Sequence, residues 1–360
     1  MELDSKFENV PNRSLYKYLS KLTSMQFKYF YCIFVHCWAN HKSFISDKNF
    51  LNLWLELNQL CYDVNESFPE QCNNEEINIY CGVKKRHKKQ FKRDKKDYEK
   101  LSEHIGLIPL VMISPSDEEL IHGGSEERRK FIDGFISQYN KKYLQSLLSY
   151  KKILEQRNSM LKELQNDGLL FDVIEEQMSV LGVYIHQERK KFIEQFLPIF
   201  QDFHQTISSG KEVVQLEYKS QLGNGEELST LLKATRERDF ILGYTSKGIH
   251  KDDLEMTLDS MPIKRTGSQG QNKTFLIALK LSQFNLLEKI SGKRPILLFD
   301  DMFDKLDKQR AEKIISILGG NQLGQIFISD TDRVSLPTIL DESSYKYKLF
   351  TVESGEISLK

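Results

Sequence analysis

The chain has 360 residues, 51 basic and 51 acidic side chains, and five cysteines. This length is enough for two or three structural units, and the composition excludes collagen-like, disulfide-dense and wholly disordered proteins. No apolar run approaches the roughly 20 residues of a membrane span, and the charged start differs from a signal peptide, so we expect a soluble, cytoplasmic protein without membrane contacts.

The first 81 residues are unusual because they contain all five cysteines, both tryptophans and no glycine. At average usage, roughly five or six glycines would be expected there. Residues 1–72 carry 14 aromatic side chains without a period of 2 or 3.6, so pattern assigns them no fold. The cysteine spacings include no CxxC, which favours free thiols over a zinc site or a disulfide framework.

The first recognisable elements lie between residues 76 and 124. Ile77, Ile79 and Cys81 alternate with polar neighbours, as in a half-buried strand. Residues 106–115 (GLIPLVMISP) predict a buried strand, and residues 116–121 predict a short helix that Gly123 and Gly124 end.

A basic run lies between these two strands, with nine Lys or Arg against one Asp in residues 84–96. Such a run can follow a nucleic-acid phosphate backbone, and a solvated hairpin is the alternative. The candidate DNA-binding residues are Lys84, Lys85, Arg86, Lys88, Lys89, Lys92 and Arg93.

Two long helical patterns follow and predict a helical arm. The first runs from Ser125 to about Asp167 with apolar residues at i+3 and i+4 spacing, and the second covers residues 171–207, with a bend expected at Pro198. Globular helices average about 11 or 12 residues. We therefore expect an antiparallel hairpin that projects from a compact head.

Arg128 and Arg129 stand at the start of the first long helix, where positive charge opposes the helix dipole. This position predicts an anionic neighbour, or pairing with Glu126 or Asp133. The two arginines are secondary site candidates.

The remaining pattern predicts the second half of the head. His250 and Lys251 lie in a polar loop where local hydrogen bonding is commoner than catalysis, so they are also secondary candidates. The apolar strands that alternate with helices predict a parallel sheet covered on both faces. In chain order we expect a strand at 213–218, a helix at 226–238, a loop at 243–253, a helix from about 266 to 290, a strand at 295–299, a helix at 308–318, a strand at 325–329 and a hairpin at 346–357.

The strongest chemical signal is ILLFDDMFDKLD at residues 296–307. Four apolar residues predict a central strand, and two carboxylates follow at its end, where ligands bind in open α/β sheets. In phosphoryl-transfer sites the first carboxylate holds Mg²⁺ and a neighbour can polarise the attacking water, which assigns these roles to Asp300 and Asp301. A strand that simply ends in an acidic turn is the alternative.

A second signal is the segment from Gly267 to Gln271, which opens an apolar helix. Small residues allow close backbone approach, and the N–H groups of a helix start favour an anion. By itself a Ser-capped helix is commonplace, but this one lies about 30 residues before the acidic strand. That order matches the signature helix and Walker B strand of ABC-type ATPase heads.

From about Asn73 to the C-terminus the sequence resembles RecF, in the form found in the Bacteroidetes group. Six segments in the same order carry this resemblance. They are SPSDEELIHGGSEERRKFID (114–133), LEQRNSMLK (154–162), GYTSKGIHKDDL (243–254), GSQGQNKTFLIALKLSQF (267–284), PILLFDDMFDKLD (295–307) and QIFISDT (325–331).

The resemblance implies an ATP- and Mg²⁺-dependent homodimer of SMC/ABC-type heads that acts in DNA replication, DNA damage repair and the SOS response. Such a protein binds single-stranded DNA and single-strand/double-strand junctions and helps partner proteins to load RecA. It also implies residue roles. Asp300 and Asp301 resemble the Walker B pair, with Mg²⁺ at Asp300; Ser268, Gln269, Gly270 and Gln271 resemble the signature that reaches the partner subunit's γ-phosphate; Asp304 and Asp307 resemble the D-loop.

One departure concerns the Walker A loop. RecF-like proteins carry GxxxxGK[ST] near the N-terminus, whose glycines and lysine wrap the phosphates. This chain has no glycine before Gly82, so it cannot hold that loop there. Two explanations remain, a frameshifted reading of a RecF gene that regains its frame near Asn73, or a genuine divergent N-terminus.

The expected fold is α/β, an ABC/SMC-type ATPase head with a mixed sheet, flanking helices and an inserted helical arm. We expect residues 1–72 unassigned, the head at 73–124 and 211–360, and the arm at 125–210. The expected function is a RecF-type mediator, with a non-catalytic DNA-binding or partner-binding relative as the alternative. Another SMC-like ATPase is disfavoured because the arm is short and lacks a CxxC hook.

Overall fold

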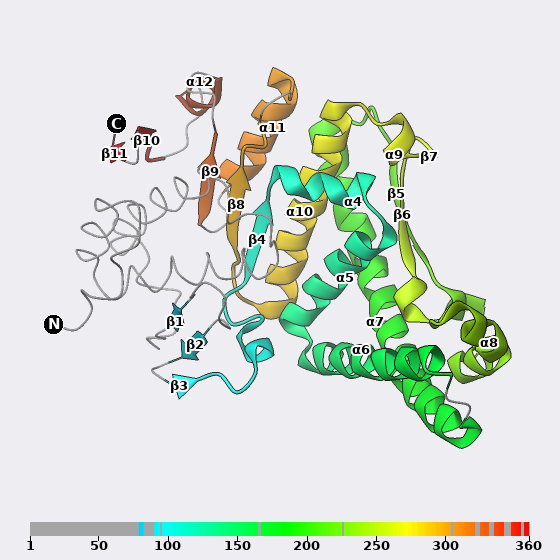
Figure 1. Ribbon diagram of the computed structural model, residues 1–360. Helices are drawn as coiled ribbons and strands as arrows, with labels where there is room; N and C mark the ends of the chain where they lie inside the picture. Colours follow the sequence, from blue (N-terminus) through cyan, green and yellow to red (C-terminus); the bar gives the residue numbers. More distant parts are fainter. Residues whose placement is uncertain are drawn as a thin grey trace. The chain divides into compact units, whose positions relative to one another are not determined.

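The computed structural model describes residues 79–82, 90–93, 96–164, 167–224, 227–303, 306–320, 325–330, 335–341, 347–353 and 356–359. The unassigned segment 1–72, the basic positions 84–89 and Asp304 lie outside these ranges. The chain divides into two compact units, one of residues 1–104 and 345–360 and a larger one of Ile105–Ser344. Figure 1 labels their elements.

In the smaller unit the described strands form two antiparallel sheets. A three-stranded sheet has the order β1-β2-β3, and β10 pairs with β11 as a hairpin. The strand expected around Cys81 and the hairpin expected near the C-terminus are therefore confirmed. The bounds are β1 (Ile79–Gly82), β2 (Gln90–Arg93), β3 (Lys96–Asp97), β10 (Phe350–Glu353) and β11 (Glu356–Leu359).

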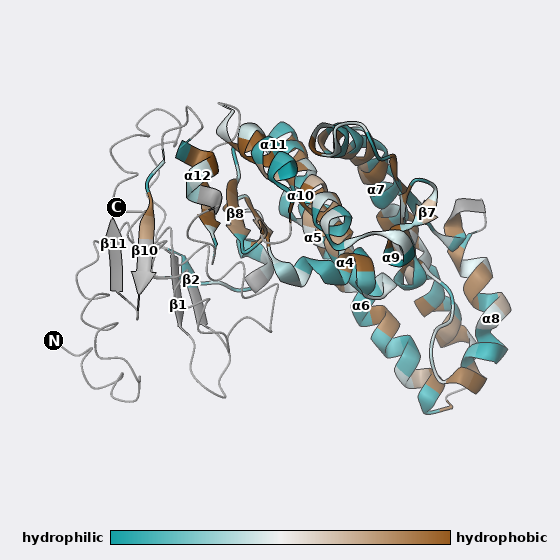
Figure 2. Ribbon diagram, turned by 90° about the horizontal axis from the view of Figure 1, so that it is seen from above, coloured by the Kyte–Doolittle hydropathy of each residue, from teal (hydrophilic) through white to brown (hydrophobic). Residues whose placement is uncertain are grey.

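The larger unit contains the predicted parallel sheet, in the order β4-β8-β9. In its register Ile113 faces Phe299, and Asp300 faces Ser329, so the carboxyl ends of all three strands share one edge. β4 is buried along its whole length, and Figure 2 shows β8 in the hydrophobic colour. The strands are β4 (Leu110–Ile113), β8 (Ile296–Asp300) and β9 (Ile326–Ser329).

Helix α10 (Gln269–Ser291) is the central helix of this unit, and it packs on both β4 and α7 (Gly168–Ser208). Every residue from Asn272 to Phe284 is buried. A helix that is buried on all sides loses the polar face of an amphipathic helix. From Asn272 to Phe284 the signature helix is thus a core element, which fixes the direction in which its exposed start points.

A second sheet is antiparallel, has the order β5-β6-β7 and packs against helices α5 and α7 of the same unit. Buried and exposed residues alternate along β5 and β6, because α7 packs against β5 and α5 against β6. Only the first of these three strands is expected from the sequence. The strands are β5 (Val214–Lys219), β6 (Asp253–Leu258) and β7 (Met261–Pro262).

The helical arm differs from its prediction at Asn140. The expected single helix from Ser125 is two helices, α5 (Ser125–Tyr139) and α6 (Lys141–Lys162), so that prediction is wrong. Asn140 has φ −115° and ψ 92°, and its side chain accepts the Tyr143 N–H at 2.9 Å, which caps α6. The hairpin is formed by α6 and α7, which pack together. α7 continues through Pro198 as one helix.

Two fully buried arginines join the arm to the rest of the unit. Arg157 of α6 pairs with Glu175 of α7 at 2.9 Å and with Asp239 of α8 (Leu228–Leu242) at 2.8 Å. Arg189 of α7 pairs with Asp133 at 2.9 Å and Asp252 at 3.0 Å. Each guanidinium is shared by two carboxylates, so each of these buried charges has a partner of opposite sign.

None of the described helices is long and apolar enough to cross a membrane. The other short elements are η3 (Leu101–His104), η4 (Pro115–Glu118), α4 (Glu119–His122), η5 (Gln221–Asn224), η6 (Ile249–Lys251), α9 (Ile263–Thr266), α11 (Lys308–Gly319) and α12 (Ser335–Asp341).

Candidate nucleotide-binding edge and signature segment

The two predicted Walker B carboxylates lie at the carboxyl edge of the parallel sheet. Asp300 is the last residue of β8, and the Ser329 hydroxyl of β9 donates to Asp300 Oδ1 at 2.7 Å. The Asp301 N–H donates to the Ser329 carbonyl at 3.0 Å, and Asp301 has φ +48°, in the left-handed region. This conformation turns the chain out of the strand directly after Asp300. Both carboxylates remain half-exposed at the edge.

The end of β4 anchors the signature helix to the same sheet. Ser114 follows β4 and is fully buried, and its N–H donates to Asp117 Oδ2 at 2.9 Å. The other oxygen of Asp117 lies 2.7 Å from Lys280 Nζ of α10. This buried ion pair fixes α10 against the strand that neighbours β8. The sequence pattern singles out neither member of the pair.

The signature segment forms a reciprocal cap at the start of α10. Gln271 N donates to Ser268 Oγ at 3.3 Å, and Ser268 N donates to Gln271 Oε1 at 2.9 Å, as in a capping box. Ser268 and Gln269 are exposed, while Gly270 and Gln271 are half-exposed. The four predicted signature residues therefore form one accessible helix start, where the helix dipole favours an anion.

The signature segment also contacts the predicted D-loop. Asp307 caps α11 by accepting the Arg310 N–H at 2.9 Å, and its second oxygen lies 3.1 Å from Arg310 Nε. The same guanidinium reaches α10, where it donates to Thr274 Oγ1 at 2.7 Å. Arg310 is a residue that sequence reasoning missed. Its only sequence signal is its place three residues after the cap, which predicts a local ion pair but not the contact with α10.

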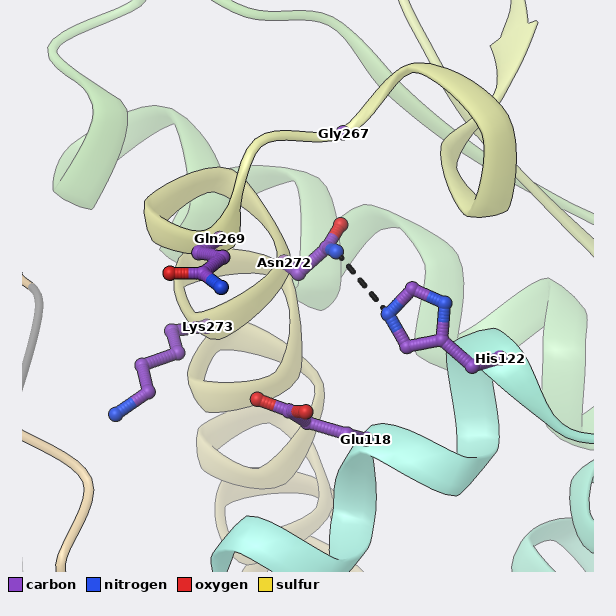
Figure 3. Close-up of a pocket in the computed structure, with 6 residues that line it drawn as sticks. All are labelled: Glu118, His122, Gly267, Gln269, Asn272 and Lys273. Carbon is purple, nitrogen blue, oxygen red and sulfur yellow. Dashed lines mark hydrogen bonds between the residues drawn. The ribbon is translucent and has the colours of Figure 1, made fainter.

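A polar cavity of about 330 Å³ opens beside the start of α10. Figure 3 shows Gln269 and Lys273 on α10, with Glu118 and His122 on the facing segment. Asn272 Nδ2 lies 3.3 Å from His122 Nε2 across this gap. The lining residues are Glu118, His122, Gly267, Gln269, Asn272 and Lys273. The cavity leaves the signature segment open on one side.

His250 is engaged inside the protein through both ring nitrogens. Nδ1 lies 3.0 Å from the Tyr150 hydroxyl, and Nε2 lies 3.0 Å from the Thr245 carbonyl. Burial lowers the pKa of His250 to about 4, so the ring is neutral at pH 7. Lys251 Nζ lies 5.0 Å from the centre of the Tyr244 ring, a cation–π contact. These contacts hold the loop between α8 and β6 in place.

The two arginines at the start of α5 are paired with the same loop. Arg128 forms a two-pronged pair with the Asp253 carboxylate at 2.7 and 3.0 Å. Arg129 donates to the Asp252 carbonyl at 2.6 Å, and burial lowers its pKa. The expected anionic neighbour of Arg128 is thus Asp253, and the specific pairing with Glu126 or Asp133 is wrong for it.

Of the seven candidate DNA-binding residues, only Lys92 and Arg93 fall within the described part. Both lie on β2, with Arg93 exposed, and Lys92 Nζ lies 3.8 Å from Asp97 Oδ2. Among the described residues no group of three or more His, Cys, Asp or Glu side chains could hold a metal ion.

Comparisons with known proteins identify the family. No protein-family model matches the chain. A curated protein of Parabacteroides distasonis named "DNA replication and repair protein RecF" is 54% identical over 78% of this chain and 77% of its own length. Proteins of the same name from Bacteroides fragilis and Bacteroides thetaiotaomicron are 52% and 50% identical over 82% of the chain and 78% and 79% of their lengths.

Solved structures agree with this assignment. A structure of the recombination mediator protein RecF-ATPrS in the RecFOR pathway has a TM-score of 0.68 at 28% identity and covers 80% of this chain and 77% of that one. The corresponding RecF-ATP structure has a TM-score of 0.67 at 27% identity, covering 79% and 76%. The α/β fold is therefore that of an ABC/SMC-type ATPase head. The chain belongs to the RecF family of DNA replication and repair proteins.

Proposed function

We propose that this chain is a RecF-type recombination mediator that works in the cytoplasm on single-stranded DNA and on single-strand/double-strand junctions. It assists partner proteins in loading RecA during replication, repair and the SOS response. The observation that carries the proposal is identity of about one half to curated RecF proteins over about four-fifths of the chain. We also propose that domain boundaries fall at residues 72, 124 and 210. They separate the unassigned segment, the first part of the head, the arm and the second part of the head.

Within this function the half-exposed carboxylates at the sheet edge handle the metal and the water. Asp300 and Ser329 present hard oxygen donors, the kind that Mg²⁺ takes when substrate phosphates complete its shell. Asp300 would hold Mg²⁺, and Asp301 would polarise the attacking water. The accessible segment from Ser268 to Gln271 would offer an anion-binding helix start to the γ-phosphate bound by a partner subunit in a homodimer, with Asp307 as the neighbouring D-loop residue.

A second candidate function is a RecF relative that binds DNA or partners without a nucleotide. The sequence supports this candidate because GxxxxGK[ST] occurs nowhere in the 360 residues. Asp300 and the signature then act without a phosphate cradle, and we expect no ATP hydrolysis by this polypeptide. Saturable Mg-ATP binding together with ATP-dependent dimerisation of the purified chain would rule the second candidate out.

The role of Asp301 has its own test. When GxxxxGK[ST] is restored in place of the N-terminal segment, Asp301→Asn should preserve ATP binding and abolish turnover, because only the water-polarising carboxylate is lost. Hydrolysis that persists in this variant would defeat the role given to Asp301. Resequencing the start of the coding DNA separates the frameshift from a divergent N-terminus, since a one-base correction should reveal GxxxxGK[ST] in frame.

A further inference from the structure

Three segments of the larger unit meet at one guanidinium, that of Arg310 on α11. Nη1 donates to Thr274 Oγ1 at 2.7 Å and to the Gly270 carbonyl at 3.3 Å, both near the start of α10. Nη2 donates to Glu212 Oε1 at 2.7 Å, in the connection between α7 and β5. Nε lies 3.1 Å from Asp307 Oδ2, the cap of α11. Arg310 therefore contacts the signature helix and the D-loop residue at once.

Glu212 extends this network to the exposed signature serine. Its side chain is 7% exposed, and Oε1 also accepts from Gln271 Nε2 at 3.2 Å. Gln271 Oε1 in turn accepts the Ser268 N–H at 2.9 Å. A continuous chain of hydrogen bonds thus runs from Arg310 through Glu212 and Gln271 to Ser268. Arginine suits this position because its planar fork can serve several acceptors together.

Charge makes Arg310 the main partner of Glu212. His204 of α7 lies 3.5 Å from Glu212, between Nε2 and Oε2. Burial lowers the pKa of His204 to about 4, so this ring is neutral at pH 7 and forms no ion pair. Loss of Arg310 would leave the nearly buried Glu212 carboxylate beside a neutral ring and without its cation, which destabilises this local arrangement.

A second cation of α11 gives a natural comparison. Lys313 Nζ donates to the Thr206 carbonyl at 3.1 Å and to Ser209 Oγ at 2.5 Å, at the carboxyl end of α7. Lys313 therefore ties α11 to the carboxyl end of α7, whereas Arg310 ties α11 to Glu212 and to α10.

We propose that Arg310 and Glu212 are positioning residues that lock the signature segment, the cap of α11 and the connection between α7 and β5 into one block. α7 is 41 residues long and forms the arm hairpin with α6, so movement of the connection that follows α7 is passed to Ser268 through this block. The inference rests on the proposed function only in treating Ser268 to Gln271 and Asp307 as ATP-handling groups.

Amide hydrogen exchange on the full chain, without nucleotide or DNA, tests the block directly. In Arg310→Gln we expect exchange at residues 269–274 and 308–311 to rise about tenfold, while residues 280–288 of α10 keep wild-type protection. Lys313→Gln is the matched control. It removes a cation from the same helix and should leave residues 269–274 unchanged.

Two further variants separate positioning from general stability. Arg310→Lys keeps the charge but loses the fork, so exchange at residues 269–274 should fall between wild type and Arg310→Gln. Adding Glu212→Gln to Arg310→Gln should restore part of the lost protection, because the unpaired carboxylate is removed. If Arg310→Gln does not fold, Arg310→Lys against Lys313→Gln supplies the same comparison.

Unchanged exchange at residues 269–274 in the Arg310 variants would overturn the proposal, and so would an equal rise in Lys313→Gln. If Arg310→Lys raises amide exchange evenly along α10, the proposal is also overturned, because an even rise reports a loss of general stability and not a local release of the signature segment. The assay contains neither ATP nor DNA. The exchange results therefore do not change if the proposed function is wrong. Equally, exchange results that overturn the block leave the proposed function untouched.

Discussion

Arg157 and Arg189 in the arm, and Arg310 beside the signature segment, all pair with carboxylates, but the first two are buried and the third is partly exposed to solvent. In the arm, Arg157 and Arg189 are 0% and 1% exposed, and each pairs with two carboxylates. At the start of α10, Arg310 is 18% exposed and the neighbouring Ser268 and Gln269 face solvent. The arm is thus fixed by buried charge, whereas the signature segment is held from one side and left open to a ligand.

The largest expected effect comes from the buried group. Arg157→Met should lower the free energy of unfolding by about 3 to 5 kcal/mol, because Glu175 and Asp239 lose a shared buried cation. Urea denaturation followed by circular dichroism measures it. Arg238→Gln, at an exposed position of α8, is the control and should change stability by less than about 0.5 kcal/mol. A similar small effect for Arg157→Met would contradict the role given to this cluster.

Arg310→Gln should lower the free energy of unfolding by less, about 1 to 2 kcal/mol, because the Arg310 guanidinium is partly solvated. Its partners are two carboxylates, one hydroxyl and one backbone carbonyl. The same urea experiment gives the value. If Arg310→Gln lowers the free energy of unfolding as much as Arg157→Met does, the contrast between the buried arm arginines and the partly exposed Arg310 is contradicted.

A pH effect is expected in both regions, because each contains a buried histidine. Burial lowers the pKa of His204 and of His250 to about 4 from the ordinary value of 6.5. Their neutral forms therefore stabilise the fold fully above pH 6.5, and this contribution is lost as the pH falls toward 4. The slope is up to about 1.4 kcal/mol per pH unit for each histidine.

His250→Asn and His204→Asn should each flatten the dependence of stability on pH between 6.5 and 4. Thermal unfolding at fixed pH values measures the slope, and His122→Asn is the control because His122 is exposed. A slope that neither buried-site variant alters would mean that other groups control acid stability.

The smallest expected effect concerns the two described candidate DNA-binding residues, Lys92 and Arg93 on β2. Lys92→Gln with Arg93→Gln should weaken DNA binding several-fold and reduce the salt slope by about 1 to 2, as for two phosphate contacts. Lys130→Gln is the control, because Lys130 already lies 3.0 and 2.8 Å from Glu126 and Glu127. Equal losses for the two sets would contradict a specific role of these two β2 cations in DNA binding.

The strands that carry chemistry could be predicted because their patterns are local. The apolar run before Asp300 and the buried run at 106–115 each form a strand of the expected parallel sheet. The Ser cap at 268 likewise begins the expected helix. In these cases composition within a few residues decides the type of element, while the observed boundaries differ from the expected ones by one to four residues.

Features that depend on distant partners could not be predicted. β6 is not among the expected strands, since only its first residue, Asp253, falls in the expected loop at 243–253, and Asp253 is paired with Arg128 from 125 residues earlier. The break at Asn140 is hidden by an apolar stripe that continues into α6. Arg310 and Glu212 lie 98 residues apart, so no local pattern indicates their contact.

Junction binding tests the central claim most directly. The full chain is titrated by fluorescence anisotropy against three labelled DNA ligands of equal length, a single-strand/double-strand junction, a blunt duplex and a single strand, at fixed salt. The account predicts tighter binding to the junction than to the duplex, with a salt slope that reports phosphate contacts. Equal affinity for junction and duplex, or binding to neither, would contradict it.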